Sequence, residues 1–163
     1  TTGLLTTLFP DRIDLPPDTL RTAQARLDEA SCVRDAMTAA AAGPVTAMHD
    51  ATEGGLHGAF VEMASGAGVR FEIERDRVPM RPGVEATCAA LDVDPWTATA
   101  SGSLVLTVDP EGTEAVLSAL AERGATVARV GHVTDGEGVA VDGEEIEAPS
   151  VDSSWAAYSR LST

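Results

Sequence analysis

The chain has 163 residues, the size of one ordinary domain, and 44% of them are hydrophobic, which is enough for a core without disulfides or metals. No apolar run approaches the ~20 residues that cross a bilayer, and no basic stretch precedes a short apolar segment at the N-terminus, so neither a membrane span nor a signal peptide is expected. The 26 acidic residues against 11 basic ones give a formal net charge of −15, which argues against binding to nucleic acid or to anionic membranes.

The first 43 residues are expected to form three helices. Leucines at helical spacing predict a helix over residues 2–9, and Phe9-Pro10-Asp11 ends it. Pro16-Pro17-Asp18 opens a second helix. Ser31 is the expected N-cap of a third, which Gly43-Pro44 ends. The inward stripe of this third helix is expected to be Val33, Ala36, Met37 and Ala40.

The middle of the chain alternates strands and helices. Val45–Met48 is a short apolar strand, and residues 49–55 turn into a helix whose buried face comprises Leu56, Ala59, Phe60, Met63 and Ala64. Residues 69–74 alternate apolar and charged side chains, which predicts a half-buried strand. A short helix follows over Gly83–Leu91. Ser103–Val108 is almost wholly apolar, so we expect a strand covered on both faces.

The last third adds a helix that begins at Asp109-Pro110, two strands at Thr126–Val133 and Gly138–Val141, and a final helix at Ser153–Leu161. Alternating strands and helices predict a single α/β (α+β) layered domain over residues 1–163, a mixed sheet with helices packed on it. The pattern alone does not order the strands.

The turn from His49 to Gly55 is the candidate site. Gly54 and Gly55 allow a ligand to approach the backbone closely, and the first N–H groups of the following helix, unpaired at the positive end of its dipole, suit a phosphate. The carboxylates of Asp50 and Glu53 would repel a bare phosphate, but they fit a Mg²⁺ ion held between carboxylate and phosphate. Thr52 offers a hydroxyl to the same phosphate.

The same residues have a purely structural interpretation. Asp50 or Thr52 is a suitable helix N-cap, the two glycines suit tight packing, and His49 suits a turn. His132 is expected to be a strand residue rather than a ligand, and Trp96 a packing anchor. Spacing alone leaves the ligand site and the simple helix cap both open.

The two cysteines, Cys32 and Cys88, lie in alanine-rich, helix-like segments. They are too few and too far apart for a disulfide framework or a zinc motif, so we expect small buried hydrophobic residues. Their sparse use favours a cytoplasmic protein.

All 11 basic residues are arginine, and the chain contains no lysine. An acidic chain without lysine is typical of proteins from extreme halophiles, although codon bias in a GC-rich genome gives a similar composition. If the protein is halophilic, salt will stabilise it by screening repulsion among its carboxylates.

A resemblance to a known family gives the turn more weight. The segment from Val45 to Leu56, VTAMHDATEGGL, resembles the D-x-T-x-G-G-L signature in the second domain of the aminoimidazole ribonucleotide (AIR) synthetase superfamily. Ser101-Gly102-Ser103-Leu104 resembles the S-G-x-L step into a central strand of that family. Val130-Gly131-His132-Val133 and Val78-Pro79 resemble two further family segments, in the same order along the chain.

The resemblance covers about residues 1–145 and implies a PurM C-terminal-like fold, partly like a ferredoxin. The superfamily includes selenophosphate synthetase, thiamine monophosphate kinase and the hydrogenase maturation protein that makes the cyanide ligand. Its shared chemistry is attack by a small substrate on the γ-phosphate of ATP, achieved by positioning and charge neutralisation. The chain begins at Thr1, and the resemblance implies that an N-terminal ATP-binding domain lies outside it and that two protomers pair as a homodimer.

By the same resemblance, Asp50 and His49 are the expected catalytic residues, and Asp50 is also the expected Mg²⁺ ligand. Thr52, Glu53, Gly54 and Gly55 are expected to bind ATP or the small-molecule substrate. The isolated domain is expected to be inactive. Two alternatives stay open: a non-catalytic module for phosphate-ligand binding or dimerisation, and a structural domain whose loop only caps a helix.

Overall fold

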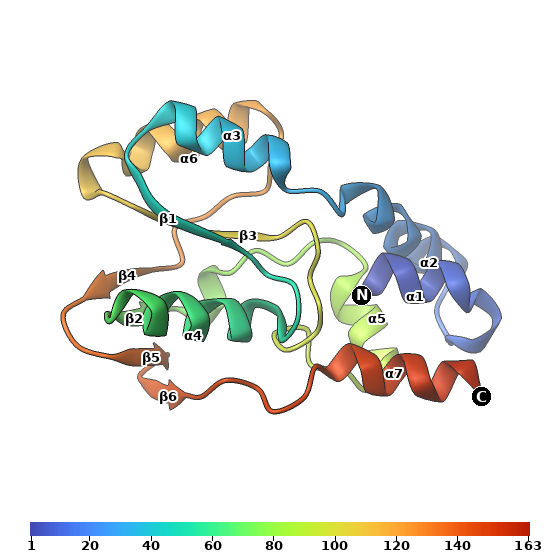
Figure 1. The fold of residues 1–163 in the computed structure, drawn as a ribbon. Helices are drawn as coiled ribbons and strands as arrows, with labels where there is room; N and C mark the ends of the chain where they lie inside the picture. The colour runs from blue at the N-terminus through green and yellow to red at the C-terminus, as the bar shows by residue number, and fades with distance from the viewer.

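The computed structural model describes residues 1–163 (Figure 1). The α-helices are α1 (Thr2–Leu8), α2 (Pro17–Gln24), α3 (Val33–Ala42), α4 (Gly55–Ala67), α5 (Val84–Leu91), α6 (Thr113–Glu122) and α7 (Ser153–Ser162). The strands are β1 (Val45–Asp50), β2 (Arg70–Ile73), β3 (Leu104–Val108), β4 (Gly131–Thr134), β5 (Gly138–Val141) and β6 (Glu144–Ile146). Short 3₁₀ turns are η1 (Pro10–Arg12), η2 (Ala25–Glu29), η3 (Arg75–Arg77) and η4 (Pro110–Gly112). No helix is long and apolar enough to span a membrane.

The six strands form two sheets, which confirms the expected mixed α/β architecture and supplies the strand order. β1 and β3 pair antiparallel, with His49 opposite Val105 and Asp50 opposite Leu104. The second sheet has the order β4-β2-β5-β6, in which β2 and β5 are parallel and the other pairs antiparallel.

Helix α4 carries the largest hydrophobic core. Four residues of its predicted buried face, Ala59, Phe60, Met63 and Ala64, are at most 8% exposed, and the fifth, Leu56, is half-buried against the same core. The Phe60 ring contacts those of Phe71 and Trp96, with centroids 6.5 and 6.1 Å apart. The sheet contributes four side chains to this core. In β2 apolar and charged residues alternate, and β5 is a run of apolar residues, so that the buried ones are Phe71, Ile73, Val139 and Val141.

A second cluster joins the helices at the end of the molecule where both termini lie (Figure 1). Leu5 of α1, Cys88 and Leu91 of α5 and Ala157 of α7 form its centre. This arrangement places the N-terminus of α7 beside the loops that surround the start of α4, and it therefore bears on the candidate site.

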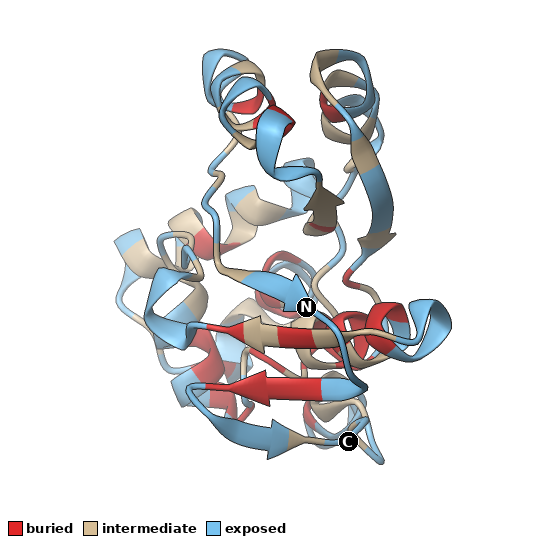
Figure 2. Ribbon diagram, turned by 90° about the vertical axis from the view of Figure 1, so that its left-hand side faces the viewer, coloured by how far each residue is buried: buried red, intermediate tan, exposed pale blue.

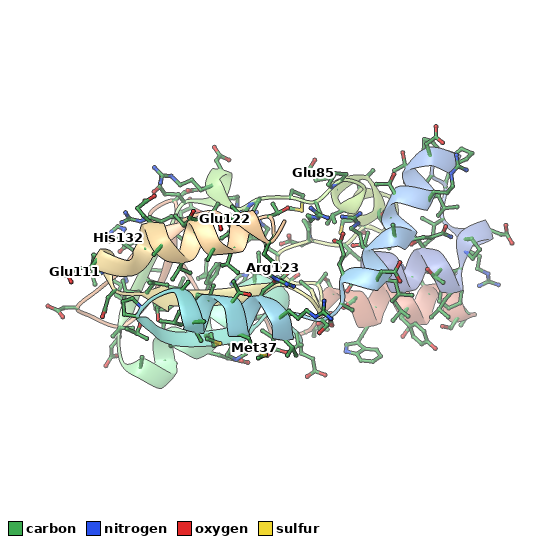
Figure 3. All side chains as sticks on the ribbon, turned by 90° about the horizontal axis from the view of Figure 1, so that it is seen from above. Met37, Glu85, Glu111, Glu122, Arg123 and His132 are labelled. Carbon is green, nitrogen blue, oxygen red and sulfur yellow. The ribbon has the colours of Figure 1, made fainter.

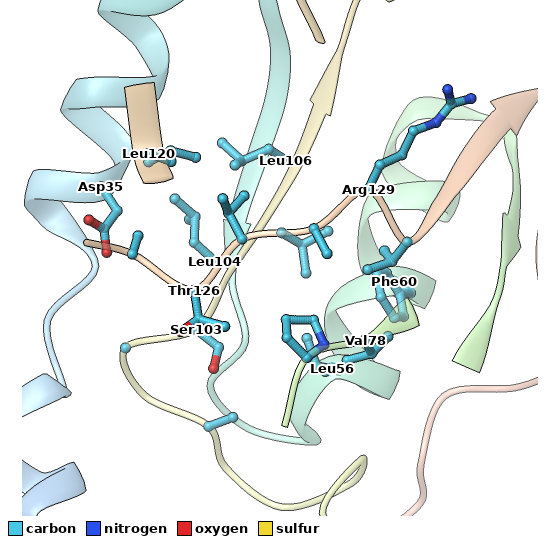
Figure 4. A pocket seen from close by; sticks show the side chains of 18 of the residues that line it. Asp35, Leu56, Phe60, Val78, Ser103, Leu104, Leu106, Leu120, Thr126 and Arg129 are labelled. Atoms are coloured by element: carbon cyan, nitrogen blue, oxygen red, sulfur yellow. The ribbon is translucent and has the colours of Figure 1, made fainter. Parts of the chain in front are cut away.

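A third, smaller cluster holds α3 and α6 together, around Ala39, Val116 and Leu120. Figure 2 shows these two helices standing apart from the four-stranded sheet, whose buried residues lie in β2 and β5. Between them and that sheet lies a crevice of about 1300 Å³, part of which is seen in Figure 4 with Leu104, Leu106 and Leu120 on one side and Leu56, Phe60 and Val78 on the other.

Two strand predictions need correction, and one strand has no counterpart among the predictions. The ladder of β4 begins at Gly131, so residues 126–130 of the predicted strand lie outside it along the crevice, and the Val130 carbonyl accepts a hydrogen bond from the Glu74 amide at 2.8 Å. β3 is not covered on both faces, because only Val105 is buried and the crevice opens beside it. The short edge strand β6, whose sequence is mostly acidic, was not predicted.

The predicted stripe of α3 is also wrong. Val33 is 61% and Met37 68% exposed, whereas Ala39 is completely buried. The helix presents its small alanines to α6 and leaves its larger apolar side chains outside. Cys32, rather than Ser31, is the N-cap residue, and no side-chain hydrogen bond caps the helix. Asp109-Pro110 begins the turn η4, and α6 itself starts at Thr113.

Candidate functional site

The candidate loop begins where β1 ends and is fixed by the turn that precedes β3. The amide of Ala51 donates to the carbonyl of Ser103 at 3.0 Å, and the amide of Ala100 donates to the carbonyl of Ala51 at 2.9 Å. The D-x-T-x-G-G-L and S-G-x-L segments, about 50 residues apart in the sequence, therefore lie against each other. Asp50 is the last residue of the ladder, opposite Leu104.

Gly55, the first residue of α4, occupies a position that only glycine fits. Its φ is +61°, and a Cβ atom there would lie 2.6 Å from the carbonyl oxygens of both Trp96 and Ala98. The amide of His57 in the first turn of α4 donates to the same Trp96 carbonyl at 3.0 Å. The start of α4 is thus pressed directly against the backbone of residues 96–98, and this contact leaves no room for a side chain at Gly55.

Asp152, which the sequence reasoning missed, fixes the loop from the other side. Its carboxylate accepts hydrogen bonds from the Gly54 amide at 2.9 Å and the Thr99 hydroxyl at 2.6 Å, and it caps α7 through the Ser154 amide at 2.8 Å. Partial burial raises the pKa of Asp152, but the hydrogen bonds from Ser154, Thr99 and Gly54 outweigh burial and leave this pKa below its ordinary value. The N-cap position before α7, an Asp followed by Ser-Ser, was the available sequence signal.

This contact corrects one premise of the sequence argument. Three amides at the start of α4 are not free for a phosphate: that of Gly54 donates to the Asp152 carboxylate, that of Gly55 to the Thr52 carbonyl, and that of His57 to the Trp96 carbonyl. In this conformation the anion at the N-terminus of α4 is the carboxylate of Asp152.

His49 is held between two acceptors. Its Nε2 atom lies 2.9 Å from the Glu62 carboxylate on α4, and its Nδ1 atom lies 2.6 Å from the backbone carbonyl of Asp50. The Asp50 carboxylate is farther away, with Oδ1 3.8 Å from Nδ1. The imidazole therefore stands beside Asp50, at the end of β1, with its plane set by Glu62.

The other candidate side chains differ in exposure. The Asp50 side chain is 53% exposed. Glu53 is exposed, Thr52 is half-buried, and Gly54 and Gly55 are buried. No cluster of three or more potential metal-ligating side chains forms anywhere in the chain. Asp50 alone suits a Mg²⁺ ion that takes one protein carboxylate and completes its shell with phosphate and water.

Asp50 and His49 also border a shallow hollow of about 400 Å³, which we name the α3–β1 groove. Its lining residues are Cys32, Val33, Ala36, Met37, Met48, His49, Asp50 and Leu104. The larger crevice lies apart from the candidate loop, and Leu56 is the loop's only contribution to its wall. The groove is therefore the hollow that adjoins the proposed chemistry.

The remaining motif residues have structural positions. Gly102 has φ +94° and packs so closely on η2 that a Cβ atom would lie 1.9 Å from the Glu29 carbonyl oxygen. His132 is an exposed residue of β4, as predicted. Trp96 is the predicted packing anchor, 3% exposed and covered by the guanidinium of Arg75 at 4.2 Å from the ring centroid.

The cysteines are both free thiols. Cys88 is buried as predicted, and burial raises the pKa of its thiol to about 11. Cys32 is only half-buried, since it lines the α3–β1 groove.

Comparison with known proteins identifies the class to which this fold and loop belong. Residues 14–144 match the family described as "AIR synthase related protein, C-terminal domain". The match includes both the Asp50–Leu56 loop and the Ser101–Leu104 turn. The chain belongs to this family.

Within the family, the similarity is to carbamoyl dehydratase HypE. The chain is 40% identical over 99 residues to HypE of Rhizobium leguminosarum bv. viciae, covering 60% of this chain and 28% of that protein. The crystal structure of E. coli HypE, a hydrogenase maturation protein, superposes with a TM-score of 0.67 at 28% identity, covering 74% of this chain and 40% of that one. A HypE structure in complex with ATP superposes with a TM-score of 0.59 at 26% identity, covering 66% and 36%. The chain thus spans less than half the length of these relatives.

Proposed function

We propose that this chain is the C-terminal part of an ATP-dependent enzyme that resembles AIR synthetase, HypE and selenophosphate synthetase, and that uses the γ-phosphate of ATP to activate a small substrate. The observation that carries the proposal is the exposed Asp50 carboxylate at the rim of a loop whose backbone is fixed from two sides. One relative of known structure binds ATP. Such a fixed loop suits phosphoryl transfer, because catalysis there depends on positioning and charge neutralisation.

Each loop residue has a distinct part in this proposal. Asp50 is a ligand of Mg²⁺, and the ion neutralises phosphate charge when bound. His49 stands beside Asp50 and contacts the reacting substrate or phosphate. Gly54 and Gly55 hold the loop against Asp152 and residues 96–98 so that its outer side faces the ligand, and Thr52 and Glu53 line the nucleotide side of the loop. The nucleotide-binding half of the enzyme, and a second protomer, lie outside this chain.

The test is the substitution Asp50→Asn in the natural polypeptide that contains this chain. The amide keeps the size of the carboxylate but loses its charge, so Mg²⁺-dependent ATP turnover should fall by roughly 10²-fold or more, as for loss of one preorganised electrostatic contact. A Mg²⁺ titration at fixed ATP should also show a higher half-saturating concentration. Asp76→Asn, an exposed carboxylate on η3, is the matched control and should leave both values unchanged.

If Asp50→Asn retains the turnover and Mg²⁺ dependence of the parent, Asp50 is not part of the site. One observation favours a second candidate, a structural domain whose loop only caps a helix: the Gly54 amide is already occupied by Asp152. Absence of any affinity of the natural polypeptide for nucleotide, phosphate or sulfate would support this second candidate.

A further inference from the structure

Four elements form a lobe that stands apart from the rest of the molecule. β1 pairs only with β3, and α3 and α6 lie side by side around the third cluster (Figure 3). We name residues 33–50 and 104–125, which comprise these elements, the α3–α6 lobe. The crevice of about 1300 Å³ separates much of this lobe from the four-stranded sheet. The orientation of the lobe therefore depends on the contacts that do cross to the other elements.

The lobe is attached to the main core at one rung of the β1–β3 ladder. Val105 is its only buried residue in the core around α4. The cross-strand partner of Val105 is His49, whose Nε2 atom lies 2.9 Å from the Glu62 carboxylate of α4. Among the side-chain hydrogen bonds and ion pairs of the lobe, this is the only one that leads to another part of the chain. At this rung, then, a side chain outside the lobe can set how the lobe is held.

Asp50 is the last residue of β1 in the lobe, and the loop that follows it is fixed to other elements. Asp152 accepts a hydrogen bond from the Gly54 amide, and Gly55 presses against residues 96–98. The strand end and the loop thus have separate supports. The position of the Asp50 carboxylate relative to the loop therefore depends on the orientation of the lobe.

The imidazole of His49 ties the end of β1 to α4. Its Nδ1 atom lies 2.6 Å from the carbonyl oxygen of Asp50, which can only accept a hydrogen bond, and its Nε2 atom faces the Glu62 carboxylate. The ring is therefore held on one side by its own strand and on the other by the helix. Glu62 is the only acidic residue of α4, so no neighbouring carboxylate of that helix can replace it.

We propose that Glu62 is a positioning residue of the candidate site, which acts through His49 to hold the α3–α6 lobe and, with it, Asp50. The proposal rests on the proposed function for the role of Asp50 and adds Glu62 to the residues on which that role depends. The Glu62 side chain is 61% exposed, and exposed ion pairs contribute little to stability. Loss of Glu62 should therefore misplace Asp50 while the protein stays folded.

The three histidines of the chain allow a test of this contact that needs no nucleotide. Diethyl pyrocarbonate acylates an imidazole nitrogen that has a free lone pair, and peptide mass spectrometry gives the rate at each histidine of the natural polypeptide. His49 should react about threefold faster in Glu62→Ala than in the parent, on the scale of one exposed ion pair. His57 and His132 should keep their rates. Glu74→Gln, which breaks a similarly exposed ion pair with η3, is the matched control and should change none of the three rates.

ATP turnover by the natural polypeptide tests the positioning itself. Glu62→Ala should lower kcat roughly tenfold, because small displacements of a reacting group are costly. The KM for ATP at saturating Mg²⁺ should change by less than about twofold, since Glu62 acts on the placement of Asp50 and not on ATP binding. Glu62→Gln should retain most of kcat, because its Oε1 atom still accepts from His49. In a His49→Ala background, Glu62→Ala should lower kcat no further.

Three results would overturn the proposal. They are an unchanged reaction rate at His49 in Glu62→Ala, an unchanged kcat in the same variant, and a further loss of kcat in the His49→Ala background, which would mean that Glu62 acts on the ligand directly. The urea midpoint of Glu62→Ala should equal that of the parent. The two proposals fail separately: parent turnover in Asp50→Asn rejects the proposed function, whereas a fall in Asp50→Asn without one in Glu62→Ala rejects only the role of Glu62.

Discussion

At the scale of single residues, Gly55 shows how the candidate loop depends on backbone contacts. Its absent side chain lets α4 begin against the carbonyl oxygens of Trp96 and Ala98. Asp152 then fixes the preceding residue, Gly54, through its amide. The candidate side chains Asp50 and His49 precede this backbone frame at the end of β1, where His49 also contacts the Asp50 carbonyl and Glu62.

Substitution of Gly55 by alanine tests that frame. Gly68, at the other end of α4, has a similar φ of +65° but open space around its Cβ position, so it is the matched control. Gly68→Ala should reduce the free energy of unfolding by about 1 kcal/mol, the cost of left-handed backbone for alanine. Gly55→Ala should cost about 1–3 kcal/mol more because of the two carbonyl contacts. Urea unfolding measures both, and equal losses would show that the start of α4 is not tightly packed.

The residues of the loop were accessible to sequence reasoning because a glycine pair after a strand and before a helix has few uses. Asp152 was not, since it lies about 100 residues away, and its contact with Gly54 is set by the packing of α7. Likewise, nothing in the spacing of His49 and Glu62 indicates that β1 and α4 bring these side chains together. Residues from distant elements reach a site only through tertiary packing, so the spacing of the sequence does not predict them.

At the scale of secondary structure, helices and strands with one buried face were predicted well, and those at an open surface were not. The stripes of α4 and β2 follow their burial closely. The buried face of α3 was predicted wrongly because hydrophobic spacing does not distinguish a side chain that faces the core from one that faces an uncovered groove. Met37 faces the groove. The strand predicted at residues 126–133 is shortened because its pairing with β2 begins only at Gly131, opposite Ile73.

Helix α7 is attached to the candidate loop through Asp152, and this attachment should depend on pH. The pKa of Asp152 is lower in the folded chain than its ordinary value near 4. The carboxylate therefore contributes stability that is fully present above the unfolded pKa and is lost as pH falls through the lower, folded pKa. Urea unfolding of the parent chain should show this loss as the pH falls below about 4.

Asp152→Asn should remove part of that acid-dependent loss, because an amide cannot be protonated in this range, while lowering stability at pH 7. Asp76→Asn, which removes an exposed carboxylate of η3, should keep the acid profile of the parent. If the profiles of the parent and Asp152→Asn have the same slope below pH 4, Asp152 does not link α7 to acid stability.

At the scale of the whole molecule, the charge of −15 acts on every part of the fold. The carboxylates of exposed residues such as Glu85 and Glu111 lie on different faces (Figure 3), and few cations are available to neutralise them. Raising the ionic strength from 0.01 M to 1 M shortens the screening length from about 30 Å to about 3 Å. Salt therefore removes most of the repulsion among carboxylates that are not in direct contact.

We predict that the melting temperature of the chain rises between low salt and molar KCl, as expected of a halophilic protein. The double variant Glu85→Gln/Glu111→Gln should have a higher melting temperature than the parent at low salt. Its melting temperature should also rise less between low salt and molar KCl. An uncharged osmolyte at equal osmolality separates charge screening from general solvent effects. A melting temperature that is constant across the KCl series would exclude the halophilic interpretation.

The net charge also affects whether copies of the chain associate through the α3–β1 groove. An uncovered apolar hollow favours self-association, and long-range repulsion between copies of −15 opposes it. Sulfate or phosphate salts screen that repulsion and also strengthen apolar burial. The solution conditions that best preserve the fold of the isolated chain are therefore those under which its colloidal stability is weakest.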